Sequence, residues 1–332
     1  MLTKESKILL TGGAGFVGSH ICEYAIKKGV EVAIVDVFNS ETSNQEEKVA
    51  NVDHLKEEAK KNDLNLKIYP CSITDQEALT KIFVDESPSL VIHAASLVKD
   101  RYSMDVPLDF IDTNVKGSQV LLDSSNATET IEQYIFISSR SAIGEVPGAS
   151  AFMKEDNHFR PINPYGATKA AAEGLFHSFH HNTKIPVKIC RMQPMYGPRC
   201  RSDMFVWRIL QSILTGDKIQ KYGTGEGVRD WLFINDAVEA IFKIISYKAP
   251  FDIFNIGTGK GTSTNRLIEL CQEITGKEAN IEDVEVPPGD AHFAGLADCT
   301  KIKEKIGWES EVDIRSGIEL TYEYMKKHYS ES

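Results

Sequence analysis

Short apolar runs alternate with amphipathic stretches along the first part of the chain. Six of these runs predict strands: "KILLT" (7–11), "EVAIVD" (31–36), "LKIYP" (66–70), "LVIHAA" (90–95), "YIFISS" (134–139) and "VKIC" (187–190). The runs are almost continuously apolar, which is typical of parallel strands with helices on both faces. The pattern therefore predicts an α/β fold with a doubly wound parallel sheet.

The pattern becomes less regular after the last of these strands. Segments marked by Pro and Gly mix with helical stretches such as "FVWRILQSILTG" and "NDAVEAIFKII". We predict a large domain over residues 1–195 and a smaller, mixed α/β domain over residues 196–332, with some exchange of chain between them. Ligands of such folds bind beyond the carboxyl ends of the strands, so residues at those ends carry most weight for function.

Composition and charge narrow the function classes. The 332 residues are 42% hydrophobic and carry a formal net charge of −11, which disfavours a broad surface for nucleic acid or for an anionic membrane. The sequence has no run of 18 apolar residues, and charged residues lead directly into the first strand. We therefore expect no membrane span, no signal peptide and a cytoplasmic protein.

Neither the cysteines nor the histidines predict a metal site. The six cysteines are scattered with no CxxC pair, which favours reduced thiols over a disulfide framework or a zinc site. His177 and His181 stand four residues apart in "FHSFHH". From that pair alone we predict no bound metal.

Three glycines in "TGGAGFVGSH" directly follow the first strand and open a helix. Gly12, Gly15 and Gly18 let the backbone turn tightly, approach a pyrophosphate and present helix N–H groups to its charge. Asp36 ends the second strand, where a carboxylate accepts hydrogen bonds from ribose hydroxyls and repels a 2′-phosphate. Together these features predict a Rossmann domain that binds NAD rather than NADP. A glycine turn used only for packing, with Asp36 as a solvated strand end, is the simpler alternative.

A candidate catalytic group follows from the stretch "INPYGATKAAAEGLF". Tyr165 and Lys169 are four residues apart, so on a helix their side chains share one face. The ammonium and the positive nicotinamide of an oxidised cofactor favour the phenolate, so we expect the pKa of Tyr165 to fall toward working pH. Ser139 ends a strand and can hydrogen-bond the same substrate hydroxyl. The three residues predict oxidation of an alcohol.

The chain resembles the extended short-chain dehydrogenase/reductases, and among them the nucleotide-sugar epimerases and dehydratases, over almost its full length. The matching stretches are "TGGAGFVGSH", "VIHAAS", "NVKGSQVLL", "SSRSAIG", "PYGATKAAAE", "MYGPR", "VRDWLFINDAVEAI", "FNIGTGKGTS" and "PPGDAHFAGLADCTKIKEKIGW". The resemblance implies that residues 1–195 bind NAD and that residues 196–332 bind a nucleotide sugar. Besides the residues named above, it assigns to the cofactor Phe16, Val17, Ser72, Ile73, Ala94, Ala95 and Asn114.

Within this family the resemblance favours a 4-epimerase. Dehydratases carry an Asp-Glu pair after the strand-end Ser or Thr, and decarboxylating relatives keep a Glu at the place of Ser141, whereas Arg140 and Ser141 follow Ser139 here. Epimerisation needs only transient oxidation at C4, with Tyr165 as the base and return of the hydride to the opposite face. Similarity to UDP-glucuronate 4-epimerases in "RYSMDVPLDF", "CRSDMF" and the insertion after the second strand makes UDP-glucuronate the first expected substrate.

The resemblance also implies the substrate contacts. They are Arg101, Arg140, Arg201, Arg229 and Asp290. A guanidinium such as that of Arg229 suits a diphosphate, and that of Arg201 suits a sugar carboxylate. An ion pair of Arg229 with Asp230 or Asp236 is the structural alternative.

Three positions depart from the pattern of the UDP-glucuronate enzymes. Arg140 and Pro194 replace hydroxyl residues near the sugar, and Ser72 stands where relatives have an Asp beside the adenine. These departures leave other functions open: an epimerase of UDP-glucose or UDP-N-acetylglucosamine, a dehydratase or net oxidoreductase, or a catalytically silent regulator that binds NAD.

Two further stretches predict surfaces. In relatives, helices corresponding to "DFIDTNVKGSQVLLDSS" and to the Tyr165 helix form a four-helix bundle between two copies, so we expect a homodimer. The charged stretch "NQEEKVANVDHLKEEAKKND" predicts a solvated helix that covers part of the adenosine end of the cofactor.

Overall fold

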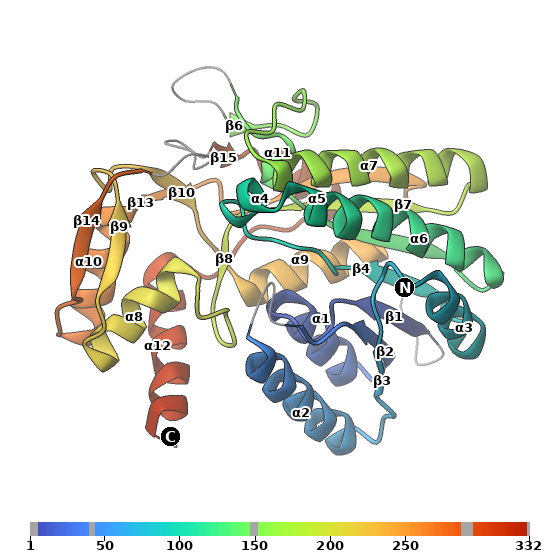
Figure 1. Cartoon of the computed structure of the whole chain (residues 1–332), viewed down its shortest axis with the longest axis horizontal. Helices are drawn as coiled ribbons and strands as arrows, with labels where there is room; N and C mark the ends of the chain where they lie inside the picture. Colours follow the sequence, from blue (N-terminus) through green and yellow to red (C-terminus); the bar gives the residue numbers. More distant parts are fainter. Residues whose placement is uncertain (1–5, 40–43, 147–151, 287–294, 331–332) are drawn as a thin grey trace.

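A parallel sheet forms the centre of the molecule. The computed structural model describes residues 6–39, 44–146, 152–286 and 295–330 (Figure 1). Within these ranges the sheet has seven strands: β1 (Lys7–Thr11), β2 (Glu31–Asp36), β3 (Lys67–Pro70), β4 (Leu90–His93), β5 (Gln133–Ser139), β7 (Val187–Met192) and β12 (Phe251–Ile256). Their order is β12-β7-β5-β4-β1-β2-β3. The order reverses between β1 and β4, and a ligand crevice is expected at the carboxyl ends of these strands.

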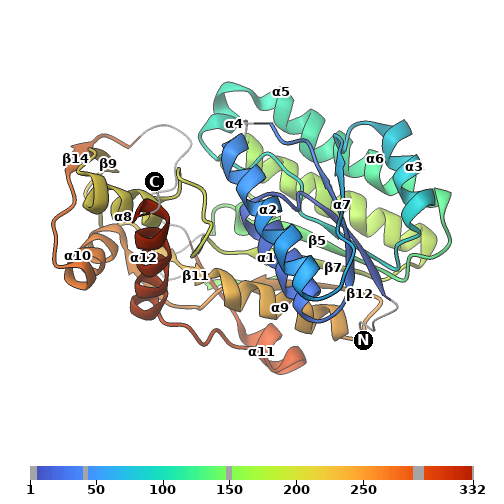
Figure 2. The same cartoon turned by 90° about the horizontal axis from the view of Figure 1, so that it is seen from below.

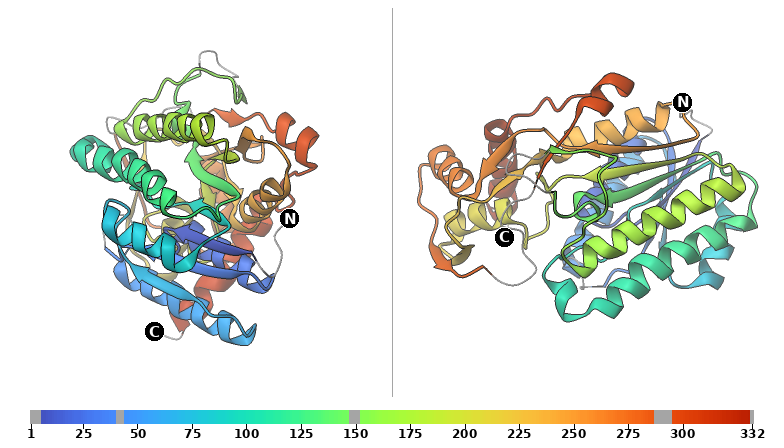
Figure 3. Two further views of the ribbon diagram at one scale, coloured as in Figure 1. Left: turned by 90° about the vertical axis from the view of Figure 1, so that its right-hand side faces the viewer. Right: turned by 90° about the horizontal axis from the view of Figure 1, so that it is seen from above.

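The sheet is buried on both faces, as its continuous apolar runs require. Ile8 and Leu10 of β1 belong to one hydrophobic cluster, and Leu9 between them belongs to the other. The first cluster includes side chains of α1 (Phe16–Lys27), α2 (Gln45–Lys61) and α9 (Ile234–Ser246), and the second includes α3 (Gln76–Glu86), α6 (Gly117–Ser124) and α7 (Pro164–Thr183). These helices form layers on opposite sides of the sheet (Figure 3). The predicted doubly wound α/β fold is confirmed.

One strand of the sheet, β12, lies outside the predicted set. It pairs in parallel with β7, where Phe254 stands beside Cys190. Helix α9 also packs on β7. The chain therefore returns to the sheet after residue 195, and the division into residues 1–195 and 196–332 stays a prediction.

Most of the remaining elements come from the C-terminal part of the chain and gather on one side of the sheet, to the left in Figure 1 and Figure 2. Helices α8 (Phe205–Thr215), α10 (Thr264–Thr275) and α12 (Ile314–Ser330) pack together. Strand pairs are β9 (Ile219–Tyr222) with β14 (Ile281–Val284), β10 (Val228–Asp230) with β13 (Gly261–Ser263), β8 (Met195–Tyr196) with β11 (Leu232–Phe233), and β6 (Phe152–Met153) with β15 (Leu296–Ala297). The other helices are α4 (Tyr102–Asp105), α5 (Pro107–Phe110), a π-helix (Ile111–Lys116), 3₁₀ turns (Ser125–Ala127, Arg140–Ala142) and α11 (Thr300–Ile306). None of the described helices is long and apolar enough to cross a bilayer.

Local sequence fixes where α7 begins. The Asn163 side chain accepts a hydrogen bond from the N–H of Gly166 at 2.8 Å, and Pro164 occupies the first helical position. Asn at the N-cap followed by Pro is a strong start signal, because the first turn lacks intrahelical acceptors for its N–H groups. Tyr165 therefore lies in the first turn of the helix, at the carboxyl edge of the sheet.

Candidate active site

A cleft of about 980 Å³ lies between the carboxyl edge of the sheet and the C-terminal elements. Most of the predicted site residues line it: Gly12, Gly15, Phe16, Val17, Gly18, Asp36, Ser72, Ile73, Ala94, Ala95, Arg101, Ser139, Arg140, Tyr165, Lys169, Arg201 and Arg229. Residues far apart in the sequence thus meet in one cavity. Asp290 lies outside the described residues.

The turn between β1 and α1 has the shape that a diphosphate requires. Gly12 has a φ of +74°, and a Cβ at this position would lie 2.7 Å from the backbone N of Ala95. A Cβ at Gly18 would lie 2.1 Å from the carbonyl oxygen of Gly12. Helix α1 starts at Gly15 without a capping side chain from the described residues, which leaves its first N–H groups for an anion.

Asp36 is held in place at the end of β2. Its carboxylate accepts hydrogen bonds from the N–H of Ala14 at 3.1 Å and of Phe38 at 3.0 Å, and it pairs with Lys48 Nζ at 3.2 Å. Both side chains of the ion pair are about 95% buried. Asp36 is therefore not a solvated strand end, and its carboxylate faces the cleft from a fixed position.

The predicted solvated helix over residues 44–63 is only partly solvated. It forms α2, and its outer face carries charges, but Lys48 and Asn51 point inward. Asn51 donates to the carbonyl oxygen of Ala14 at 2.9 Å, so α2 supports the glycine turn as well as Asp36. A signal was present in the sequence, because Lys48 shares a helix face with Val52, one turn later.

Asn114, which the resemblance assigns to the cofactor, hydrogen-bonds two other segments of the chain. It is buried outside the lining of the cleft, and its side chain accepts from the N–H of Leu97 at 2.8 Å and donates to Thr168 Oγ1 at 3.0 Å. It thereby joins the loop after β4 to α7, between Tyr165 and Lys169. Its contacts make it a support for the catalytic helix.

The end of β5 is hydrogen-bonded to α7 at two consecutive residues. Lys169 Nζ donates to the carbonyl oxygen of Ile137 at 2.9 Å, and Ser138 Oγ donates to Glu173 at 2.5 Å. Ser139 lowers the pKa of Tyr165, so the two side chains lie near each other. Tyr165, Lys169 and Glu173 are spaced at successive turns of α7, so one helix face is matched to one strand end.

The pKa of Tyr165 shifts opposite to the expected direction. Burial, followed by the negative charge of Asp100, raises the pKa of Tyr165 to about 12, against the lowering effects of Ser139, Arg201 and Arg140. Burial also lowers the pKa of Lys169 to about 7, opposed by Glu173. The protein surroundings alone therefore favour the phenol, because the site is shielded from water and includes a carboxylate.

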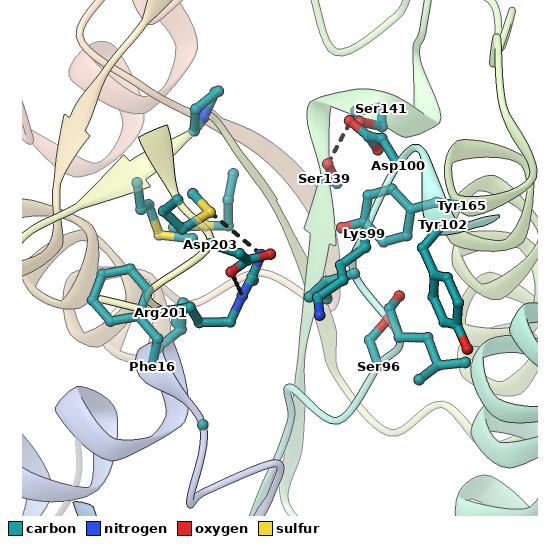
Figure 4. A pocket seen from close by; sticks show the side chains of 18 of the residues that line it. Phe16, Ser96, Lys99, Asp100, Tyr102, Ser139, Ser141, Tyr165, Arg201 and Asp203 are labelled. Carbon is teal, nitrogen blue, oxygen red and sulfur yellow. Dashed lines mark hydrogen bonds and ion pairs between the residues drawn. The ribbon is translucent and has the colours of Figure 1, made fainter. Parts of the chain in front are cut away.

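Asp100 is a site residue that sequence reasoning missed. It lines the cleft in the loop after β4, and its Oδ1 is shielded from solvent. Figure 4 places it beside Ser141 and Ser139, close to the ring of Tyr165. A carboxylate therefore lies near Tyr165 in the cleft, although neither of the two residues directly after Ser139 is Asp or Glu.

The predicted arginines enter the cleft from separate segments. Arg201 forms a two-point ion pair with Asp203, at 2.8 and 3.2 Å, across the cavity from Tyr165 (Figure 4). The guanidinium of Arg101 stacks on the ring of Tyr222, 3.8 Å from its centroid. Arg140 belongs to the 3₁₀ turn after Ser139.

Arg229 lies on β10, and the two carboxylates considered as its partners have other contacts. Asp230 accepts hydrogen bonds from the N–H groups of Thr258, Gly259 and Ala297. Asp236 accepts from the N–H groups of Glu311 and Val312. These carboxylates fix loops of the C-terminal part, while Arg229 lines the cleft.

Ser72 lies in the cleft, whereas the clustered histidines do not line it. Ser72 lines the cleft and hydrogen-bonds Thr74 through its Oγ at 2.8 Å. His177 and His180 pack against the ring of Phe251. Among the described residues no group of three or more His, Cys, Asp and Glu side chains is arranged to hold a metal ion.

The fold and cleft together fit a dinucleotide. The glycine turn provides close backbone approach and open N–H groups for a pyrophosphate, and the fixed carboxylate of Asp36 suits a ribose. Tyr165 and Lys169 line the same cleft as the glycine turn and Asp36. These features define the class, a dinucleotide-dependent enzyme of the short-chain dehydrogenase/reductase type.

The chain belongs to the GDP-mannose 4,6 dehydratase family, which it matches over residues 9–321. The resemblance seen in the motifs is thereby confirmed, and the protein is an enzyme of the nucleotide-sugar epimerase and dehydratase group. A relative from Thermodesulfobacterium geofontis, named UDP-glucuronate 4-epimerase, is 31% identical, with 96% of each chain covered.

Solved structures agree with this placement. A Thermotoga maritima UDP-glucose 4-epimerase with UDP-glucose has a TM-score of 0.85 at 34% identity and covers 97% of this chain and 99% of its own. A Bacillus cereus UDP-glucuronic acid 4-epimerase, in complex with UDP-glucuronic acid and NAD, has a TM-score of 0.87 at 29% identity and covers 97% and 100%. The expected cofactor is thus the one held by a similar protein.

Proposed function

We propose that this protein is a NAD-dependent 4-epimerase of a UDP-sugar, with UDP-glucuronate as its first substrate. The observation that carries the proposal is the meeting of Ser139, Tyr165 and Lys169 in one cleft with the glycine turn and Asp36. The segment after Ser139 reads Arg-Ser instead of Asp-Glu. The acid and base that a dehydratase places there are therefore missing from the sequence, which favours epimerisation.

The cofactor is NAD, which when bound supplies the acceptor and donor of the C4 hydride. Gly12, Gly15 and Gly18 would approach its diphosphate, and Asp36 its adenosine ribose. The carboxylate of Asp36 disfavours a 2′-phosphate, and this supports NAD over NADP. Lys48, 3.2 Å from Asp36, neutralises much of that charge. The fixed orientation of the Asp36 carboxylate toward the ribose therefore matters for cofactor choice as much as its negative charge.

Proton transfer at the sugar falls to Tyr165. Its phenolate oxygen takes the proton of the C4 hydroxyl when the sugar is oxidised, and the phenol so formed returns that proton when the sugar is reduced. Ser139 lies near Tyr165 and lowers its pKa, and its hydroxyl would hydrogen-bond the same sugar oxygen. The ammonium of Lys169, fixed by the carbonyl of Ile137, favours the phenolate. The sugar leaves with C4 inverted and without net redox change.

The identity of the sugar depends on the part of the cleft around Asp100, Arg140 and Arg201, which we call the sugar end. Arg140 and Arg201 both act on Tyr165 electrostatically, so they lie near the reacting centre. Two guanidinium groups suit the carboxylate of a uronate. Asp203 already pairs with Arg201 at 2.8 Å. When a uronate binds, Arg201 must either leave Asp203 or contact both carboxylates.

The test is a product assay with the purified protein as it carries its cofactor. UDP-glucuronate, UDP-glucose and UDP-N-acetylglucosamine are incubated separately, and the products are followed by NMR. We expect the C4 epimer of UDP-glucuronate and no accumulation of NADH. A 4-keto-6-deoxy product would identify a dehydratase, stoichiometric NADH would identify a net oxidoreductase, and absence of any product would favour the regulator.

A matched pair of variants tests the arginines. Arg140→Ser and Arg201→Gln should each reduce kcat/KM for UDP-glucuronate by ~10-fold and change that for UDP-glucose less, because only the uronate has a carboxylate to lose. Equal losses on both sugars would contradict carboxylate binding at this end.

We also propose a homodimer. Leu108 and Ile111 are 75% and 49% exposed on the segment that precedes α6, and α6 packs beside α7. Apolar side chains on neighbouring helices suit a bundle with a second copy. Light scattering should give twice the chain mass, and Leu108→Glu with Ile111→Glu should give the monomer.

A further inference from the structure

The segment that carries Arg201 is attached to the cofactor-binding helices. Residues 197–204, which we call the strap, connect β8 to α8. His20 Nε2 bonds the carbonyl oxygen of Pro198 at 2.8 Å, Arg199 pairs with Glu23 at 2.5 Å, and the N–H of Ser202 donates to Glu47 at 3.3 Å. His20 and Glu23 belong to α1, and Glu47 belongs to α2.

The Glu23–Arg199 pair is the strongest of these contacts. The side chains of Glu23 and Arg199 are 15% and 9% exposed, so the pair is largely withheld from water and from screening by salt. Glu23 also accepts from Lys27 at 2.5 Å and lies 3.4 Å from His54 Nε2. Although burial opposes ionisation, His54, Arg199 and Lys27 hold the pKa of Glu23 well below its usual range.

The pair remains charged through the working pH range. Burial, helped by Arg199, lowers the pKa of His20 to about 3, so this imidazole is neutral above that pH. Neutral His20 adds no positive charge beside Arg199. Glu23 therefore keeps its negative charge opposite Arg199 near neutral pH.

The backbone of the strap adopts a conformation that needs support. Arg199 has a φ of +56°, and Gly197 two residues earlier has a φ of +143°. For a residue with a side chain the left-handed region is sterically disfavoured. Arg199 does not line the cleft, whereas Arg201 does. The bend therefore directs alternate arginines to opposite sides, one to α1 and one to the cleft.

We propose that the Glu23–Arg199 pair is a positioning device that sets the place of Arg201 at the sugar end by fixing the strap to α1. Arg199 acts through Arg201 and not on the substrate. This inference rests on the proposed binding of a UDP-sugar. The same helix begins at the glycine turn, so the substrate arginine and the diphosphate turn share one rigid support.

The test uses Arg199→Gln and Glu23→Gln in the full chain with bound NAD, and Lys27→Gln as the matched control. Lys27 is an exposed partner of Glu23 and touches neither the strap nor the cleft. We expect each strap variant to raise KM for UDP-glucuronate by ~10-fold and to change kcat less than twofold. Arg199→Lys should recover part of the loss, and the control should match the wild type.

Two further measurements separate this role from general destabilisation and from failure of the proposed function. Binding of UDP alone should stay within twofold, because UDP lacks the sugar that the proposal assigns to Arg201, and the double variant should lose no more than either single variant. A crystal structure of Arg199→Gln should show Arg201 displaced relative to Tyr165 on α7, whichever sugar the enzyme uses. An unmoved Arg201, or equal weakening of UDP and UDP-glucuronate, would overturn the inference.

Discussion

The cofactor end and the sugar end of the cleft differ in what presents their polar groups. Around Gly12 and Asp36, backbone N–H groups and one carboxylate fixed by backbone atoms make the surface. Around Asp100, Arg140 and Arg201, charged side chains from three separate segments make it. The first surface is determined by local chain geometry. The surface at the sugar end depends on tertiary packing. We therefore expect single substitutions there to alter the proposed preference among sugars.

Charge is balanced differently at the two ends. At the cofactor end, Lys48 and Asp36 form a buried pair at 3.2 Å that has backbone contacts as well. At the sugar end, Arg201 pairs with Asp203, while Asp100 and Arg140 act on Tyr165 with opposite signs. A change in one charge should therefore alter fit and stability at the first end, and proton affinity and selectivity at the second.

The largest expected effect comes from the group that joins the two ends. Tyr165→Phe removes the hydroxyl that handles the proton and should lower kcat by ~10³-fold, within the usual range for a general acid or base. Binding of UDP-glucuronate, measured by calorimetry, should stay within threefold, because the ring remains. Turnover above one tenth of the wild-type value would remove Tyr165 from the reaction.

Lys169 should cost stability while it serves catalysis. Its pKa of about 7 in the folded protein lies below the usual 10.4 of the unfolded chain, so the unfolded state binds more protons between these values. The cost is full below pH 7 and disappears as pH rises toward 10. Lys169→Met should raise the free energy of unfolding at pH 7 by roughly 2–4 kcal/mol, as measured with urea.

The pH dependence of this stability difference is the control. The gain of Lys169→Met over the wild type should shrink steadily between pH 7 and pH 10, whereas activity is lost at every pH. A gain that grows with pH would have the wrong sign and would reject the buried-ammonium interpretation.

Asp100→Asn should move the pH profile. Burial and then Asp100 raise the pKa of Tyr165 to about 12, so removal of the carboxylate charge lowers that pKa. More phenolate is present at a given pH, and the acidic limb of kcat/KM should shift to lower pH with up to ~10-fold more activity on that limb per pKa unit. Asp203→Asn, across the cleft, is the comparison variant. An unchanged limb in Asp100→Asn would place its carboxylate outside the reaction.

Lys48→Met gives the smallest effect and tests the cofactor end. Loss of the ammonium leaves Asp36 with its two backbone donors, so the carboxylate should keep its place but gain repulsion toward a diphosphate. We expect NAD to bind ~5-fold more weakly by calorimetry, with no change in the preference among UDP-sugars. A changed preference among UDP-sugars would show that the cofactor end and the sugar end do not act independently.

The cofactor end was largely predictable from the sequence, and the reason is local. Gly12 and Gly18 follow a strand directly, Asp36 ends the next strand, and parallel strands bring their carboxyl ends to one edge. The same rule placed Ser139 next to Tyr165. The strands could be predicted because both faces of the sheet are covered, and strands buried on both faces need continuous apolar runs.

The remainder depends on contacts that spacing does not encode. Lys48 lies in a charged helix, and only its place on the face of Val52 and Leu55 indicates burial. Asp100 is one of three consecutive charged residues in a loop, and its approach to Tyr165 results from how that loop packs. The pKa of Tyr165 is raised by burial and by the charge of Asp100, and the sequence indicated neither effect.

Strand β12 has a consequence for how the chain can be cut. It covers one margin of the sheet through its pairing with β7 along residues 251–256. A fragment that stops at residue 195 would leave the main-chain groups of β7 bare, and such an uncovered strand is a template for intermolecular pairing. The sheet is thus completed by residues that follow α8 and α9 in the chain. Residues 1–195 expressed alone should therefore aggregate.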